Sequence, residues 1–291
     1  MSEHIEYVIN PDSYRQQIAN VMEDILPLTP IQIHTDLARI GLIGSIKNHH
    51  DMLKEHYDYL IEAIGPDREV IFPTFNYDFP KTKTYDVMSD PCQVGILNEY
   101  VRKLNPTERT LTPMFNFVIL NRHMFPLSCS KNTVGSDSIF GLLAKNHGEL
   151  LFFGSLFEQS FTFIHYIEDL VDVPYRYPKR FKGVVIHPTG KKEVEISYRV
   201  QPLKKIRDTL NFAIEYDISK CLKETENHKL IARYPLGNGF CIRLDAFPIA
   251  SLFKEILEND PFYFLTAVSK KAVLKVLEKL GGRMTFENME G

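Results

Sequence analysis

The chain has 291 residues, of which 44% are hydrophobic and 24% charged, and its formal net charge is -3. This composition is typical of a folded globular protein with one large or two smaller α/β domains, and it argues against a disordered chain. The small net charge gives no reason to expect nucleic acid or an anionic membrane as a partner, so we expect a small molecule.

The first residues lack the basic start and the apolar core of a secretory signal, and no apolar run approaches the ~18 residues of a spanning helix. We therefore predict a cytoplasmic protein without a membrane segment. The cysteines are widely spaced, which predicts free and mostly buried thiols rather than a zinc or redox site. They are Cys92, Cys129, Cys221 and Cys241.

The start of the chain predicts a helix over residues 11–26, with apolar side chains at helical spacing behind a capping sequence. A β-branched strand over 30–34 then runs through a polar turn into a second helix over 49–65, which makes a βα unit. Thr35 and Asp36 in this turn are residue types that cap a helix. The free N–H groups at a helix start can also hold a phosphate, so both roles stay open.

A strand over residues 68–72 ends in a loop over 73–80 that is too rich in proline and polar side chains to continue a regular element. Ligands of open α/β sheets bind beyond the carboxyl ends of strands. Thr74, Asn76 and Asp78 are therefore candidates for a cleft, although loops carry such side chains without any functional role about as often.

Residues 94–104 carry a helical apolar stripe that an Asn-Pro pair ends, and an apolar strand follows over 114–120. Arg109 and Thr110 lie between the two elements. Such an arginine can form a structural ion pair, or it can anchor a phosphate or a carboxylate.

The apolar run 150–154 predicts a buried strand that ends at a glycine, and helical spacing begins after it. This spacing puts Thr162 and His165 on one helix face, and Glu168 or Asp169 follows on the same face. A histidine with an ordinary pKa of about 6.5 beside a carboxylate can accept a proton near neutrality, as general-base chemistry requires. On spacing alone, the alternative is a histidine that only packs on the helix while Glu168 is exposed.

The remainder of the chain predicts more strands and helices without a dividing linker. Residues 173–180 predict an extended link whose basic side chains are solvated, and a β-hairpin with a glycine turn follows over 183–200. Further predicted elements are helices over 204–217, 247–257 and 269–280 and a strand over 240–244. We therefore predict one domain of the α/β class over 1–291, with 173–200 as a β excursion near the cleft.

Five short blocks follow one another along the first half of the chain. They are His34-Thr35-Asp36-Leu37, Phe72-Pro73-Thr74-Phe75, Gly95-Ile96-Leu97-x-Glu99-Tyr100-x-Arg102, Arg109-Thr110-x-Thr112-Pro113 and Phe161-Thr162-x-x-His165-x-x-Glu168. In this order they resemble the aminoglycoside 3-N-acetyltransferase family, also called the antibiotic acetyltransferase family. The likeness spans residues 31–168.

The resemblance implies transfer of an acetyl group from acetyl-coenzyme A to a primary amine of a sugar or aminocyclitol. It also implies a three-layer α/β/α fold with a mixed central sheet. His165 would be the general base with Glu168 orienting its ring, and a hydroxyl or backbone N–H near Thr74 or Thr162 would stabilise the oxyanion. Direct attack on the thioester needs neither a covalent acyl-enzyme nor a metal, and we predict no metal site.

Two sets of binding residues are expected from the matched blocks. The predicted coenzyme contacts are His34, Thr35, Asp36, Leu37, Arg109 and Thr110, and the predicted acceptor contacts are Asn76, Asp78, Glu99 and Asp169. Asp36 stands where the family has a second hydroxyl residue, and a carboxylate would repel a pyrophosphate. It therefore either caps the helix and points away, or the phosphates bind only Thr35 and nearby backbone.

The sequence departs from the family at Thr112, where a histidine is usual, and at Asn116, where a small hydroxyl residue is common. Both departures weaken the case for an aminoglycoside drug as substrate. A site for such polycations should also offer several carboxylates, and the matched blocks contain only Asp78, Glu99 and the Glu168-Asp169 pair. The expected acceptors are aminoglycosides and nucleotide-linked or polysaccharide-precursor amino sugars. A catalytically inactive relative that binds coenzyme A or a sugar is the alternative. The acceptor, the acyl group and the oligomeric state, a homodimer included, stay open.

Overall fold

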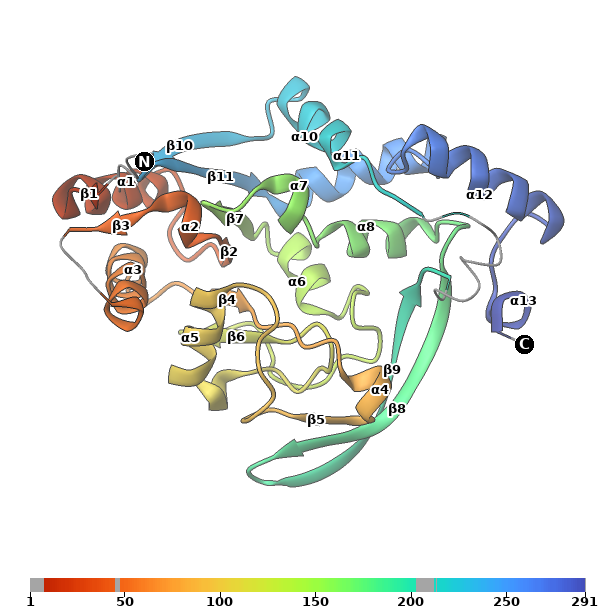
Figure 1. Ribbon diagram of the computed structural model, residues 1–291, viewed down its shortest axis with the longest axis horizontal. Coiled ribbons are helices and arrows are strands. Elements are labelled where there is room, and N and C mark those ends of the chain that lie inside the picture. Colours follow the sequence, from red (N-terminus) through yellow and green to blue (C-terminus); the bar gives the residue numbers. More distant parts are fainter. Residues whose placement is uncertain (1–7, 45–47, 203–211, 213, 291) are drawn as a thin grey trace, which may run out of the picture.

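A mixed six-stranded sheet forms the centre of the computed structural model, which describes residues 8–44, 48–202, 212 and 214–290 (Figure 1). From one edge to the other its strands are β10 (Ala232–Leu236), β11 (Gly239–Asp245), β7 (Glu149–Phe153), β2 (Ile31–Thr35), β4 (Val70–Pro73) and β6 (Phe117–Leu120). β2 is parallel to β7 and β4, its two neighbours. β11 is antiparallel to β10 and β7, and β6 is antiparallel to β4.

Helices cover both faces of this sheet. One face packs against α1 (Pro11–Glu23), α3 (His49–Ile64) and α5 (Ile96–Leu104), and the other against α6 (Ile139–Lys145), α7 (Phe157–Ser160), α8 (Ile164–Val171) and α11 (Ala246–Asn259). Successive side chains of a strand point to opposite faces, so Leu150 and Phe152 enter one core while Leu151 and Phe153 enter the other. The expected three-layer α/β/α fold with a mixed central sheet is confirmed.

The helices of the first layer begin where the sequence predicts. The Asn10 side chain accepts a hydrogen bond of 3.0 Å from the Ser13 N–H, and Pro11 is the first residue of α1. Asn48 caps α3 in the same way through the Asp51 N–H, at 2.8 Å. Each cap satisfies a backbone donor that the helix leaves unpaired.

The parallel strands β2, β4 and β7 end at the same edge of the sheet. Short elements fill the connections along this part of the chain: α2 (Leu37–Ile40), β3 (Leu42–Ile43), α4 (Phe79–Thr82), β5 (Thr84–Asp86) and the 3-10 turn η1 (Pro106–Glu108). β3 pairs in parallel with β1 (Val8–Ile9). The predicted loop after β4 is therefore interrupted by the single helical turn of α4.

The helical spacing after β7 is realised as two helices, not one. Phe161 ends α7 with a ψ of 60°, and the Thr162 N–H donates to the Ser160 carbonyl over 2.7 Å. Thr162 thus lies in the turn before α8, whereas His165 and Glu168 lie on α8 itself. The prediction of one helix face for all three was wrong, because the buried phenylalanines continue the apolar pattern through the turn.

The predicted β-hairpin is confirmed and is longer than expected. β8 (Tyr177–His187) pairs with β9 (Gly190–Val200), and β5 adds to β8 in parallel to make a three-stranded sheet. Figure 1 shows this hairpin extending along the lower right of the body. The predicted solvated link before it was wrong in one respect, since Arg176 is only 4% exposed.

The C-terminal part adds α10 (Ile218–Asn227), α12 (Ala267–Lys279) and α13 (Phe286–Glu290). The predicted helix over 204–217 falls largely outside the described residues, while those over 247–257 and 269–280 correspond to α11 and α12. In the described part of the chain, no helix combines the length and the apolarity that crossing a bilayer requires.

Candidate active site

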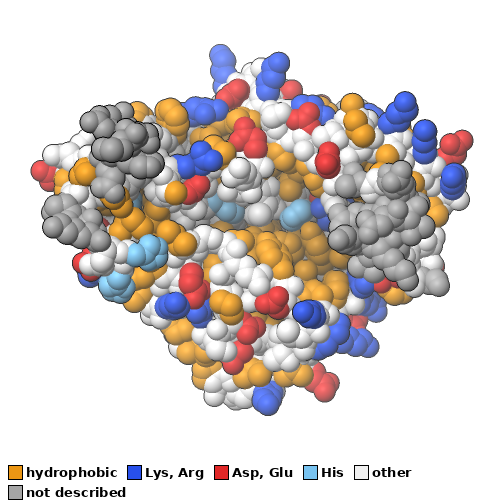
Figure 2. All heavy atoms as spheres, viewed as in Figure 1, with side chains coloured by type: hydrophobic (Ala, Val, Ile, Leu, Met, Phe, Trp, Pro, Cys, Tyr) orange, Lys and Arg blue, Asp and Glu red, His pale blue; other side chains and the backbone are white. Residues whose placement is uncertain are grey.

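A hollow lined mainly by hydrophobic side chains opens in the middle of one face of the molecule, and histidine side chains border it (Figure 2). In the same orientation, Figure 1 shows α6, α7 and α8 crossing this central region. The first turn of α8 carries His165, and this helix follows directly from the carboxyl end of β7 through α7.

His165 contacts one acidic side chain and two aromatic rings. Its Nδ1 is 3.4 Å from Oε2 of Glu168, and its side chain remains 22% exposed. The rings of Phe115 and Tyr198 contact the imidazole edge-on, each at a centroid distance of 5.8 Å. When Nδ1 carries the proton, it donates to Glu168 and leaves Nε2 available as a base.

Glu168 is buried, and it is held by three other side chains. Arg176 Nε lies 2.8 Å from Oε2, while the hydroxyls of Tyr175 and Tyr216 donate to Oε1 over 2.8 and 2.6 Å. Burial favours the neutral acid, but the Arg176 charge and the hydrogen bonds outweigh it, so the pKa of Glu168 is below its ordinary value. The carboxylate therefore stays ionised next to His165.

The pKa of His165 is also lowered. Burial is the largest cause, the hydrogen bond with Glu168 opposes it, and the positive charge of Arg176 adds to the lowering. The imidazole is thus neutral near pH 7 and able to accept a proton.

The two hydroxyls predicted near the oxyanion lie in different environments. Thr162 Oγ1 is buried and finds no hydrogen-bond partner among the described residues. Thr74 is fully buried, donates to Asn116 Oδ1 over 3.0 Å and lies 3.3 Å from Nε of Arg109. Of the two hydroxyls, only that of Thr162 is without a partner among the described residues.

The turn predicted to bind the coenzyme resolves the alternatives for Asp36. The Asp36 side chain caps α2 by accepting from the Ala38 N–H over 3.2 Å, and it pairs with Arg39 at 3.1 Å. Thr35 donates to Asn98 Oδ1 over 3.2 Å, and Leu37 is buried. Asp36 is thus a cap whose charge is partly compensated.

His34 is a buried ring within β2. It stacks on Phe152 at a centroid distance of 5.2 Å, and its Nε2 lies 2.7 Å from the Gln32 amide nitrogen. Burial lowers the pKa of His34 to about 3, so this ring is neutral. A coenzyme contact by His34 stays a prediction.

Arg109 is fully buried, and its guanidinium N–H groups bond to other residues of the protein. Its guanidinium donates to the side chain of Asn116 and to the carbonyls of Thr74 and Asp90, at 2.9, 2.8 and 2.6 Å. Thr110 accepts from the Phe117 N–H over 3.0 Å. These contacts hold the loops together, and a coenzyme contact by Arg109 or Thr110 stays a prediction.

The predicted acceptor residues are dispersed. Asn76 is buried, and its amide group donates to the Pro91 carbonyl and accepts from the Asp78 N–H. Asp78 is exposed and accepts from Gln93 over 2.9 Å.

The two other predicted acceptor residues also have protein partners. Both Glu99 oxygens accept from Arg102, and the pKa of Glu99 falls to about 2 because these bonds outweigh its burial. Asp169 accepts from Asn132 over 2.9 Å, and burial raises its pKa. Asp169 is next to Glu168 in the chain, whereas Asn76 and Asp78 lie in the loop after β4 and Glu99 lies on α5.

Sequence reasoning missed Arg176 and Tyr216 as parts of the site. Arg176 stands in a basic, aromatic stretch without periodicity, and Tyr216 lies 48 positions after Glu168, so no spacing connects them. Four cysteines remain as free thiols, as expected. The described residues contain no group of three or more His, Cys, Asp or Glu side chains placed to hold a metal ion.

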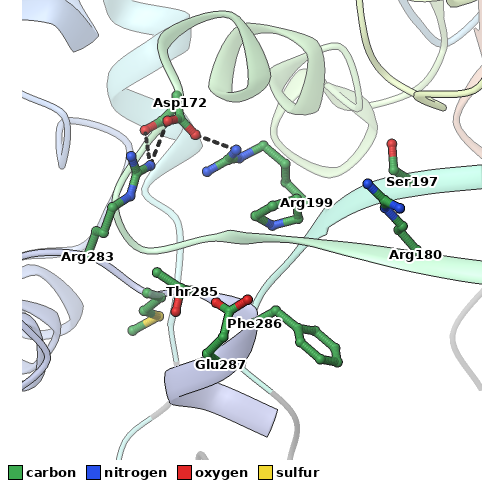
Figure 3. Close-up of a pocket in the computed structure, with 10 residues that line it drawn as sticks. Asp172, Arg180, Ser197, Arg199, Arg283, Thr285, Phe286 and Glu287 are labelled. Atoms are coloured by element: carbon green, nitrogen blue, oxygen red, sulfur yellow. Dashed lines mark hydrogen bonds and ion pairs between the residues drawn. The ribbon is translucent and has the colours of Figure 1, made fainter. Parts of the chain in front are cut away.

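A separate cavity of about 710 Å³ lies between the hairpin, the end of α8 and α13. Figure 3 shows Arg199 and Arg283 both directed at Asp172, whose single negative charge they share. His165 does not line this cavity. Arg199 also donates to the Arg176 carbonyl over 3.0 Å, so the cavity wall supports the segment that carries Arg176.

Comparisons with known proteins agree with this architecture. Residues 33–258 match the family described as aminoglycoside 3-N-acetyltransferase. A comparison with curated protein sequences finds no match.

Three solved structures illustrate the similarity of fold. The apoenzyme of aminoglycoside acetyltransferase AAC(3)-IVa is 17% identical with a TM-score of 0.65, and 93% of this chain and 99% of that chain are covered. AAC-IIIb in a binary complex with CoASH is 17% identical with a TM-score of 0.63, covering 87% and 97%. A histidine-to-alanine mutant of AAC(3)-IVa in complex with a gentamicin is 14% identical with a TM-score of 0.66, covering 91% and 94%. The family match extends over most of this chain. The chain therefore belongs to the aminoglycoside 3-N-acetyltransferase family and is an N-acetyltransferase.

Proposed function

We propose that this enzyme transfers the acetyl group of acetyl-coenzyme A to a primary amine of an amino sugar, with His165 as the general base. The observation that carries the proposal is the partly exposed His165 ring, whose Nδ1 lies 3.4 Å from the ionised Glu168 carboxylate. The CoASH complex of AAC-IIIb and the gentamicin complex of AAC(3)-IVa support these two classes of substrate.

In this mechanism His165 takes the proton that the amine loses as it attacks the thioester carbonyl. A C–N bond forms, the tetrahedral intermediate collapses, and the C–S bond breaks. The leaving sulfur then receives the proton from His165. The Thr162 hydroxyl, which is buried without a described partner, donates to the oxyanion of the intermediate.

The coenzyme binds along the turn after β2. Asp36 caps α2 and pairs with Arg39, so its carboxylate is partly neutralised and does not oppose a nearby pyrophosphate as a free charge would. Thr35 and the neighbouring backbone provide the polar contacts.

The acceptor carries few positive charges. Glu99 is bound by Arg102, and Glu168 by Arg176, so neither carboxylate is free to pair with a polycation. The half-buried Tyr198 ring lies beside His165 instead, and its apolar face can pack against a sugar. A nucleotide-linked amino sugar fits these surroundings better than a polycationic aminoglycoside.

The experiment is a thiol-release assay with acetyl-coenzyme A and a panel of aminoglycosides and nucleotide-linked amino sugars. A reaction without acceptor corrects for the four cysteines of the chain, which also react with thiol reagents. We expect acceptor-dependent release, with kcat/KM higher for nucleotide-linked sugars than for aminoglycosides. Faster turnover of the aminoglycosides would reverse the acceptor assignment and keep the enzyme class.

His165→Ala and His165→Asn test the general base. Both variants should lose about 10²–10⁴-fold in kcat while the coenzyme Kd stays unchanged, because the base acts on the acceptor amine. His187→Asn is the matched control, since His187 lies on the hairpin and hydrogen-bonds to Thr189. Wild-type kcat in His165→Asn would refute the mechanism.

A further inference from the structure

Arg176 is a buried cation in contact with both members of the proposed base. Its side chain is 5% exposed, and its Nε lies 2.8 Å from Oε2 of Glu168. Its Nη2 lies 3.4 Å from Nδ1 of His165, the same nitrogen that faces Glu168. The guanidinium thus touches the carboxylate and the imidazole together.

The remaining donors of Arg176 are also engaged, which fixes the guanidinium plane. Nη1 donates to the Arg199 carbonyl over 2.8 Å and to the Tyr198 hydroxyl over 3.2 Å. Nη2 and Nε both point to the Tyr216 hydroxyl, at 2.7 and 3.0 Å. An arginine with this many partners has one orientation, and a lysine cannot reproduce it.

The Glu168 carboxylate has correspondingly little freedom. Oε1 accepts from the hydroxyls of Tyr175 and Tyr216, while Oε2 lies between Arg176 and His165. A buried carboxylate needs a positive charge beside it, and without Arg176 the group next to Oε2 that can supply one is the His165 ring in its protonated form.

We infer that Arg176 is a positioning residue of the acetyl transfer: it fixes Oε2 of Glu168 beside Nδ1 of His165 and places a permanent positive charge next to the same nitrogen. This inference rests on the proposed role of His165 as the base. It adds that Glu168 sets the orientation of the His165 ring, while the positive charge of Arg176 keeps this ring neutral between turnovers.

The charge around His165 comes from few groups. Glu168 faces the ring from α8, Arg176 from the segment before β8, and Tyr198 from β9. Phe115 completes the described surroundings and does not titrate. Of the described groups that contact the ring, only Glu168 and Arg176 are charged at neutral pH, so loss of the guanidinium leaves an attractive charge alone beside the imidazole.

Two variants separate the charge of Arg176 from its geometry. Arg176→Gln removes the charge, so the acidic limb of the kcat/KM profile against pH should move up by about one pH unit or more. Arg176→Lys keeps a charge but loses the fork of donors, so its acidic limb should stay near the wild-type position while kcat falls about tenfold or more. A residue that only supports the fold would lower activity in both variants without moving the acidic limb.

An acidic limb in Arg176→Gln at the wild-type position would overturn the inference. If Arg176→Gln fails to fold, an NMR titration of the His165 ring decides instead. A His165 pKa in Arg176→Lys close to that of the wild type, together with a kcat at least tenfold lower, supports the inference. A wild-type kcat in Arg176→Lys, or a His165 pKa that differs between the two proteins, refutes it.

The outcome for His165→Asn keeps the two proposals apart. Full activity in that variant means that the proposed base is wrong. An inactive His165→Asn together with an unshifted Arg176→Gln leaves the base in place and removes only the role of Arg176.

Discussion

The Glu168 carboxylate and the Thr162 hydroxyl are two buried polar groups with opposite surroundings. Glu168 is surrounded by donors, and each of its oxygens is bound in the protein. Thr162 Oγ1 has no partner among the described residues, although buried hydroxyls are usually hydrogen-bonded. The first arrangement fixes the position of a charge, and the second is the basis of the oxyanion role that we propose for Thr162.

Thr162→Val should therefore lower activity without lowering stability. We expect kcat to fall about 10²–10³-fold, as for other lost oxyanion donors, with the free energy of unfolding unchanged or slightly higher. Thr162→Ser keeps the hydroxyl and should retain most of the activity. Steady-state kinetics and denaturant unfolding of the same preparations measure both quantities.

Thr74→Val is the matched comparison for this experiment. Thr74 bonds to Asn116 and Arg109 inside the protein, so its loss should reduce the free energy of unfolding by about 1–3 kcal/mol. A stability loss in Thr162→Val as large as that in Thr74→Val would contradict the assignment of Thr162 to the oxyanion.

The sequence predicts those parts of the site that depend on near neighbours in the chain. His165 and Glu168 are three residues apart on a helix, and Asp36 precedes the helix that it caps. Arg176 and Tyr216 reach Glu168 from other elements through tertiary packing, which spacing does not encode. The assumption that basic side chains in a connector are solvated failed at Arg176 because a buried carboxylate binds it.

At the scale of elements, the junction after β7 sets the position of α7 and α8. Gly154 follows β7 with a φ of +73°, and the Asp36 carbonyl and the Ile40 side chain lie against it. A Cβ at this position would come within 2.6 Å of both. Glycine is thus required here for two reasons, the positive φ angle and the lack of room for a Cβ atom.

Gly154→Ala should lower the free energy of unfolding by about 2–4 kcal/mol, because left-handed strain and overpacking both contribute. Gly281→Ala is the control, since Gly281 has a φ of +75° with no atom within 4 Å of the added Cβ. It should cost only the conformational part, about 1–2 kcal/mol. Equal losses in denaturant unfolding would show that the close contacts at Gly154 are unimportant.

Periodicity predicted most elements and failed where two elements share one pattern. α1, α3, α5, α11 and α12 each bury one face, and their predicted ranges agree with the structure within a few residues. α7 and α8 were predicted as one helix because Phe157, Phe161 and Ile164 are all buried across the turn. β10 and β5 were missed, since short edge strands that carry few apolar side chains show little hydrophobic pattern.

For the molecule as a whole, the C-terminal segment is bound to the hairpin that follows the active-site arginine. The Met284 N–H donates to the Pro174 carbonyl over 2.8 Å, and Arg283 pairs with Asp172 at 2.7 Å. Glu290 accepts from the Tyr177 hydroxyl over 2.6 Å and pairs with Lys179. Residues more than a hundred positions apart therefore support the segment that carries Arg176.

Removal of residues 283–291 should destabilise the protein and lower kcat. Met284 and Met289 are nearly fully buried, so their loss alone should reduce the free energy of unfolding by on the order of 3–6 kcal/mol. Arg283→Ala, which breaks a half-exposed ion pair and a hydrogen bond to the Asp172 carbonyl, should cost about 1 kcal/mol. Denaturant unfolding and the thiol-release rate provide the measurements, and a truncated enzyme with wild-type values would refute the supporting role.

The long hairpin leaves one edge of its three-stranded sheet open. β8 is covered by β5 and β9, and on the outer side of β9 the backbone of Ser197 bonds to Lys131 and Thr133. No described strand pairs with the outer side of β9 nearer the hairpin turn, over residues 190–195. Open strand edges recruit other chains and begin aggregation, and charged side chains prevent this. Lys191, Lys192, Glu193 and Glu195 are exposed along this part of β9, so the arm projects into solvent with its own protection against fibril growth.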